Sequence, residues 1–259
     1  MQPRIQITCL LLALAAGTAL WAQTAADQPP AARVSFGAGF DYSRGDYGFA
    51  EDTEVFSVPF NATYETGRWL LRATVPWLTI RGPAAVIGGT TGGPGRPDAS
   101  ESSGLGDTYL SVTRRFAAES GWETDVSGRV KLPTADDDRG LGTGEVDSYA
   151  QADVRRTFGA VTPFVSAGYR ILGDNTRYQL QDGVYASGGA YYRTSDTTVV
   201  GASLDWRERL EPGAEHATEV TAFVSRDIGG RWQLVAYGLK GFTNASPDVG
   251  VGAHLSYKF

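Results

Sequence analysis

The sequence predicts an all-β fold: a transmembrane antiparallel up-and-down β-barrel of about 12 strands, of the bacterial outer-membrane type. Three observations predict it: an alternating carboxyl-terminal strand, a secretory leader, and a regular series of strand-length runs separated by turn residues. In such a barrel every second side chain of a strand faces lipid and the others face the lumen. Alternation along each strand is therefore the expected signal.

The carboxyl-terminal strand, predicted for residues 248–259, alternates most clearly. One face is apolar and holds Val249, Val251, Ala253, Leu255, Tyr257 and Phe259. The other face is small or polar. We expect Tyr257 and Phe259 at the membrane interface, where they close the sheet and present the strand to the barrel-assembly machinery. The alternative is a half-buried strand of a soluble sandwich, which the rest of the chain disfavours.

The amino terminus predicts a cleaved signal peptide over residues 1–22. Arg4 is the only charge before Asp27, the run Ile5–Leu20 is largely apolar, and small residues such as Ala22 follow. A transmembrane anchor is the alternative, but the run is short for a bilayer span. Residues 23–32 are then a short periplasmic segment, and residues 33–259 form the barrel.

Composition excludes several classes of function. The formal net charge of −6 argues against a nucleic-acid partner. Cys9, the single cysteine, lies in the leader, so the mature chain has neither disulfides nor thiolate metal sites. No phosphate loop, metal-ligand cluster or cofactor motif is present, and we expect no cofactor and no metal. Asp136, Asp137 and Asp138 favour a solvated acidic loop over a Ca²⁺ site, because their spacing fits no known cation loop.

The first half of the barrel is predicted from alternating runs. Its five strands are Arg33–Tyr42, Val55–Tyr64, Arg68–Thr79, Asp107–Phe116 and Trp122–Leu132. The first carries Val34, Phe36 and Phe40 on one face. In the fifth, Trp122 and Val126 lie on the face opposite a row of charges. Each run has the length and the period that a membrane strand requires.

The second half is predicted in the same way. Its seven strands are Ser148–Phe158, Val161–Leu172, Val184–Arg193, Thr198–Arg207, Thr218–Ile228, Arg231–Phe242 and residues 248–259. The strand Arg231–Phe242 fits least well, because its odd and even positions both carry large apolar residues. A bulge near Gly238 would reconcile them. Strand counts of ten and fourteen are the alternatives.

The connections alternate between short and longer, as in barrels with short periplasmic turns and long external loops. This rhythm predicts that both termini are periplasmic. The longest connection, Ile80–Gly106, is rich in Gly and Pro. We expect a flexible surface loop there, with a folded-in constriction as the alternative.

Short glycine-rich motifs follow one another through the middle of the chain. They are Gly104-Leu105-Gly106-Asp107, Lys131-Leu132-Pro133-Thr134, Gly140-Leu141-Gly142-Thr143-Gly144 and Gly168-Tyr169-Arg170. Their order resembles the outer-membrane family known as the MetA pathway of phenol degradation, whose members are often called transporters. The resemblance implies a barrel that passes hydrophobic or aromatic compounds.

The family motif comprises Gly104, Gly106, Asp107, Pro133, Thr134, Gly142 and Gly144. Taken alone, these residues favour a structural role over substrate binding. Glycines allow positive φ where a strand turns into a loop, and a proline naturally ends a strand.

The inward faces carry charges of both signs. The residues expected to line the pore are Arg72, Asp107, Arg129, Lys131, Asp153, Arg155, Arg170, Arg193, Asp205 and Glu219. Such a lumen is wet or salt-bridged and is not an apolar ligand cavity. Asp107, Arg129 and Lys131 are expected to form an ion-pair ladder on neighbouring strands. A barrel of about 12 strands has a narrow pore, which suits small polar solutes or ions.

These features predict an outer-membrane channel or transporter for small solutes, surrounded by outer-membrane lipids and lipopolysaccharide. A structural or surface-interaction barrel without transport is the alternative. A lipid hydrolase is disfavoured: His254 and Ser256 share a face, but that face is expected to look into the lumen and away from lipid. No catalytic residue is assigned.

Overall fold

The computed structural model describes the chain except for residues 1–31, 88–89, 96–100, 119 and 174–176, and describes residues 90–95 by their backbone alone. The predicted signal peptide and nearly all of the segment 23–32 therefore lie outside the described residues. No helix in the described part is long and apolar enough to cross a membrane.

Every regular element in the described part is a strand. The strands are β1 (Arg33–Gly45), β2 (Thr53–Thr66), β3 (Trp69–Arg81), β4 (Ala84–Ile87), β5 (Thr90–Gly95), β6 (Ser102–Leu105), β7 (Thr108–Ala117), β8 (Trp122–Leu132), β9 (Asp147–Arg156), β10 (Val161–Ile171), β11 (Gly183–Ser195), β12 (Thr198–Arg207), β13 (Ala217–Ile228), β14 (Trp232–Gly241) and β15 (Val249–Lys258).

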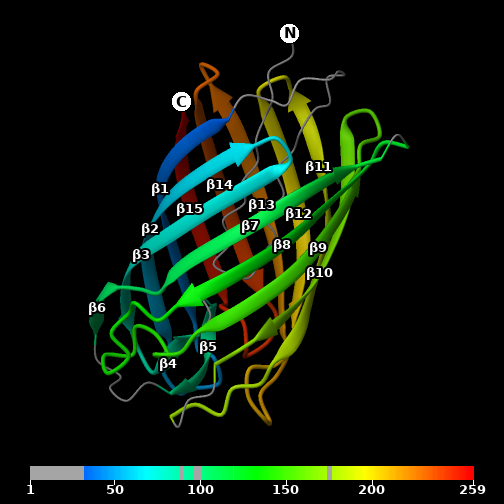
Figure 1. Cartoon of the computed structure of the whole chain (residues 1–259). Helices are drawn as coiled ribbons and strands as arrows, with labels where there is room; N and C mark the ends of the chain where they lie inside the picture. Colours follow the sequence, from blue (N-terminus) through cyan, green and yellow to red (C-terminus); the bar gives the residue numbers. More distant parts are fainter. Residues whose placement is uncertain (1–31, 88–89, 96–100, 119, 174–176) are drawn as a thin grey trace.

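Twelve of these strands close into an antiparallel barrel (Figure 1). Neighbours along the chain pair with each other, and β15 pairs back with β1 through Phe36 and Tyr257. Strands β6 and β7 pair in turn with β3 and together act as one interrupted strand. The predicted fold class and strand number are confirmed. The start of β1 and the carboxyl terminus lie at the same end of the barrel (Figure 1).

The predicted bulge in β14 is wrong. Gly238 pairs in continuous register with Ala222 of β13 and Val251 of β15. The outer face carries Trp232 and Leu234, while the competing apolar residues simply face inward. Apolar residues occupy both faces of β14 because this part of the lumen is itself apolar, as described below.

The outer surface is that of a membrane protein. Large apolar side chains are exposed at alternate positions all round the barrel, among them Phe36, Phe60 and Val165. At the end that carries the carboxyl terminus, Arg114 lies 4.7 Å from the Trp69 ring centroid and Arg156 lies 5.0 Å from that of Phe158. The guanidinium groups of these arginines lie over aromatic rings, an arrangement typical of the membrane interface.

The long connection after β3 folds inward, contrary to the predicted surface loop. Strand β4 pairs with β5, and all of Ala84–Ile87 is buried. Figure 1 shows both strands at the end of the barrel away from the carboxyl terminus. The four consecutive small or apolar residues of β4 make this segment core, despite the Gly and Pro around it.

Two apolar clusters hold β4 across the opening at this end of the barrel, which we call the mouth. The first joins it to β2, β3 and the β8–β9 loop and contains Val55, Leu78, Ile80, Val86 and Leu141. The second joins it to the loops after β10 and β12 and contains Ala85, Ile87, Tyr178, Leu180 and Leu210. Because β4 contacts both groups of strands and loops, it narrows the mouth.

Deleting Phe259 should lower the folded, membrane-inserted fraction. Its backbone N–H donates to the Val34 carbonyl at 2.9 Å, and its ring centroid lies 5.8 Å from that of Phe36, so it seals the β15–β1 seam. Heat-modifiability on gels measures the folded fraction. The control is Phe158→Ala, which removes another exposed ring far from the seam. Equal assembly of both variants would contradict a role in closure.

Candidate functional site: the barrel lumen

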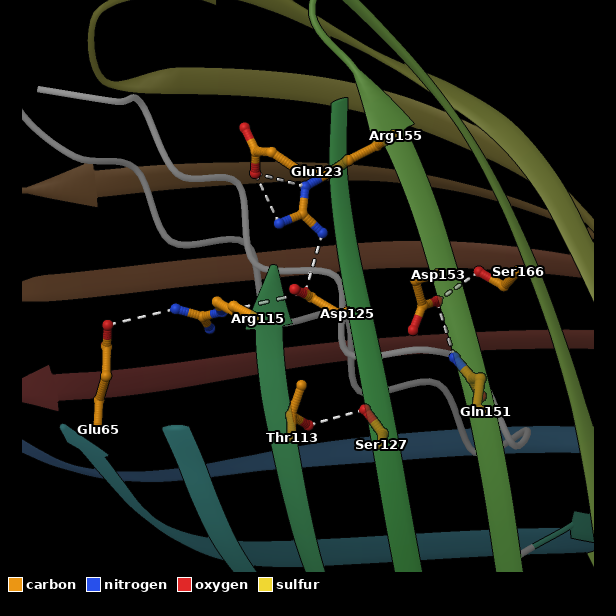
Figure 2. Close-up of polar contacts among 10 residues, drawn as sticks. All are labelled: Glu65, Thr113, Arg115, Glu123, Asp125, Ser127, Gln151, Asp153, Arg155 and Ser166. Atoms are coloured by element: carbon orange, nitrogen blue, oxygen red, sulfur yellow. Dashed lines mark hydrogen bonds and ion pairs between the residues drawn. The ribbon is translucent and has the colours of Figure 1, made fainter. Parts of the chain in front are cut away.

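An ionic wall lines one side of the lumen (Figure 2). Arg155 of β9 donates to Glu123 at 2.8 Å and to Asp125 at 3.0 Å, both on β8. Arg115 of β7 lies 3.3 Å from Glu65 of β2 and 3.9 Å from Asp125. The register makes these pairs possible, because Glu123 stands directly opposite Arg155, and Arg115 opposite Asp125.

Neutral polar groups extend the ionic wall. Asp153 accepts hydrogen bonds from Ser166 and, at 2.8 Å, from Gln151 (Figure 2). Thr113 and Ser127 hydrogen-bond at 2.8 Å across β7 and β8. Asp153 is therefore a buried carboxylate that neutral donors satisfy.

The other inward charges predicted from sequence also face the interior. Arg207 pairs with Glu219 across β12 and β13, and Ser203 donates to Asp205 at 2.8 Å. Arg72 donates to Thr63. Arg193, near the end of β11, has no ion pair within the described part of the chain. All ten predicted pore-lining positions thus lie on the inner face or at its rim.

Part of the inner face of β10 to β14, which we call the apolar wall, carries a cluster of aromatic and aliphatic side chains beside the charges of these strands, and the charge pattern did not predict it. Phe164 and Tyr191 stack with centroids 4.8 Å apart, and Phe223 meets Tyr191 edge-on at 5.6 Å. Val199 and Tyr237 complete this cluster across β10 to β14. The lumen therefore holds an apolar cluster in addition to the salt-bridged charges that were expected.

Glycines on the same wall make room for these rings. A Cβ at Gly189 would lie 2.9 Å from Phe164, and one at Gly201 would lie 2.5 Å from Phe223. Ordinary side chains at these positions would collide with the rings. The glycines in these strands therefore serve ring packing within the barrel.

A buried polar triad lies at the β14–β15–β1 seam, next to the apolar wall. Asp41 accepts from Tyr237 at 2.7 Å and lies 2.7 Å from Nε2 of His254. Nδ1 of His254 has no hydrogen-bond partner in the described part of the chain. Ser256 does not bond to this histidine, so the His-x-Ser pair does not form the nucleophile–base contact that a hydrolase uses.

Lys131 is the centre of the family-motif residues. It is fully buried and contacts Asp147 at 2.9 Å, Asp107 at 3.3 Å and Thr143 at 2.7 Å. Asp107 also accepts the backbone N–H of Ala135 at 3.1 Å. The ion pair predicted between Asp107 and Lys131 is thus present.

The motif glycines and Thr134 close around this centre. A Cβ at Gly142 would lie 2.8 Å from the Asp107 carboxylate, and Gly144 has φ +74°. Thr134 donates to the carbonyl of Gly106 at 3.1 Å and accepts from Thr108 N–H at 2.9 Å. The β8–β9 loop is thereby tied to the start of β7, directly after Pro133, which supports the structural reading of the motif.

Arg129 does not join the predicted ladder. Its guanidinium carbon lies 4.3 Å from the Tyr149 ring centroid and 5.3 Å from that of Tyr109. No hydrogen bond or ion pair joins it to any described residue. Our sequence reasoning overlooked these inward tyrosines, although strand alternation places them beside the charges that it identified.

Comparisons with known proteins establish the fold and no family. No family model matches the chain, and no curated protein matches it either. Among solved structures, the COG4313 outer membrane channel from Pseudomonas putida F1 is similar with a TM-score of 0.69 at 15% identity, covering 89% of this chain and 96% of that one.

Two further structures share the architecture. The KdgM porin has a TM-score of 0.56 at 7% identity, covering 86% of this chain and 99% of that one. The β domain of the Bordetella autotransporter Brka has a TM-score of 0.52 at 12% identity, covering 87% and 98%. The chain therefore has the fold of an outer-membrane β-barrel. The resemblance to the phenol-degradation family stays a prediction.

Proposed function

We propose that this protein is an outer-membrane channel for the passive passage of small solutes, with both termini in the periplasm. The observation that carries the proposal is a lumen with two different walls, one of ion pairs on β7 to β9 and one of aromatic rings on β10 to β14. The channel and porin named among the similar structures support it.

The apolar wall supports solutes that have an aromatic or hydrophobic part. Rings such as Phe164 and Phe223, each 8% exposed, make this part of the inner face apolar. An entirely apolar compound would bind poorly beside the ionic wall, because it would desolvate the charged side chains of that wall without replacing their hydrogen bonds. Small amphiphilic solutes therefore match the two walls better than either bulk hydrocarbons or bare ions.

The second candidate is a barrel without transport. Strand β4, which crosses the outer mouth between two buried apolar clusters, favours it. A permanently closed mouth would make the protein a structural or surface-exposed barrel.

Planar-bilayer recording separates the two candidates. We expect discrete conductance steps well below those of a sixteen-stranded porin, because a barrel of about 12 strands is narrower. Liposome swelling over a panel of small solutes then ranks what passes. The control is the same preparation left unfolded, as judged by heat-modifiability. Folded protein that conducts no better than this control would eliminate the channel.

A further inference from the structure

Six consecutive barrel strands, β7 to β12, turn tyrosine and arginine alternately into the outer half of the lumen. In order round the wall, these residues, which we call the Tyr–Arg belt, are Tyr109, Arg129, Tyr149, Arg170, Tyr185 and Arg207. The register places Tyr149 directly opposite both Arg129 and Arg170, and Tyr185 opposite Arg207. The residues of the belt therefore lie at about the same height on neighbouring strands, so their side chains are close in space.

Two arginines of the belt have no carboxylate partner among the described residues. Arg129 has only the flanking rings of Tyr109 and Tyr149. Arg170 is buried, donates from Nη2 to the carbonyls of Glu208 and Arg209, and leaves its Nε without a hydrogen-bond partner. Arg207 differs from both, because Glu219 neutralises it.

Uncompensated guanidinium groups in a confined, low-dielectric space attract anions strongly. Their planar fork of donors matches a carboxylate in particular. The surroundings are apolar as well, since Tyr149 and Tyr185 pack in a cluster with Leu172, Leu180 and Leu210. A ligand that suits the belt has an anionic head and a flat apolar body.

We propose that the Tyr–Arg belt is a binding site for small aromatic carboxylates, the solutes that the channel selects. The inference rests on the proposed function and names its substrate class. The carboxylate is held by Arg129 and Arg170, while the ring lies against the tyrosine and leucine side chains. Neutral aromatics lack the charge, and acetate lacks the ring, so both bind more weakly.

Equilibrium dialysis of radiolabelled benzoate against the folded protein in detergent tests the site, with protein-free micelles as the blank. We expect saturable binding that acetate and benzyl alcohol compete at least ten-fold less well. Arg129→Gln should weaken benzoate binding about ten-fold or more, the loss expected for a charge-assisted hydrogen bond. This variant removes no hydrogen bond to a described residue and should fold normally.

The matched control is Arg193→Gln, which removes the same charge from the inner face at the periplasmic end of β11 and should change the affinity less than two-fold. Equal competition by benzyl alcohol or acetate, or equal weakening by both substitutions, would overturn the proposal. The assay needs no current, so failure here is separable from failure of the proposed function. Conductance without benzoate binding would overturn the belt as a binding site. Binding without conductance would overturn the channel, and with it the selection of transported solutes, but would leave the binding site.

Discussion

Replacing Lys131 with methionine should strongly impair folding. The substitution leaves Asp107 and Asp147, whose side chains are 6% and 0% exposed, facing each other without their shared cation. Removing one partner of a buried ion pair typically costs about 3–5 kcal/mol, because the remaining charge stays desolvated. We expect the free energy of unfolding, measured by urea titration in lipid vesicles, to fall by about that amount.

Lys240→Met is the matched control. Lys240 pairs with Asp248 at 3.6 Å, but the two side chains are 55% and 60% exposed. An exposed pair contributes about 0–1 kcal/mol, so this variant should be nearly as stable as the wild type. Adding Asp107→Asn and Asp147→Asn to Lys131→Met should restore part of the loss. Equal stability of the Lys131 and Lys240 variants would show that the buried centre does not hold the motif together.

Replacing Ile87 with aspartate should raise the conductance several-fold. Ile87 is 1% exposed and packs with Tyr178 in the cluster that fixes β4 across the mouth. A carboxylate cannot remain in that apolar contact without a large desolvation cost, so β4 should leave the mouth and admit water. Single-channel recording in planar bilayers measures the change.

Val146→Asp is the control for this experiment. Val146 lies in the β8–β9 loop at the same end of the barrel, and it is 50% exposed and outside both β4 clusters. It adds the same charge near the mouth without disturbing the packing of β4. An Ile87→Asp conductance equal to that of the wild type, or matched by Val146→Asp, would mean that β4 does not obstruct the path.

The barrel itself could be predicted from the sequence. Side chains alternate with period two, and the lipid-facing side of a strand favours apolar residues. The alternating apolar positions of each membrane strand therefore identify its outer face. Two strands, Trp122–Leu132 and Thr198–Arg207, were predicted to the residue. The position of β14 was also predicted. Only the reason why both of its faces carry large apolar residues was wrong.

The sequence by itself therefore determined which residues face lipid and which face inward, because that choice is local to each strand. Only the tertiary structure decided what the inward residues do. Lys131 and Arg129 are two positions apart on one strand, yet one is enclosed by carboxylates and the other lies between tyrosine rings. Their partners come from neighbouring strands and loops, and β4 is held by loops far along the chain. Such contacts depend on the register between strands and on the closure of the barrel. The alternation within a single strand gives no information about either.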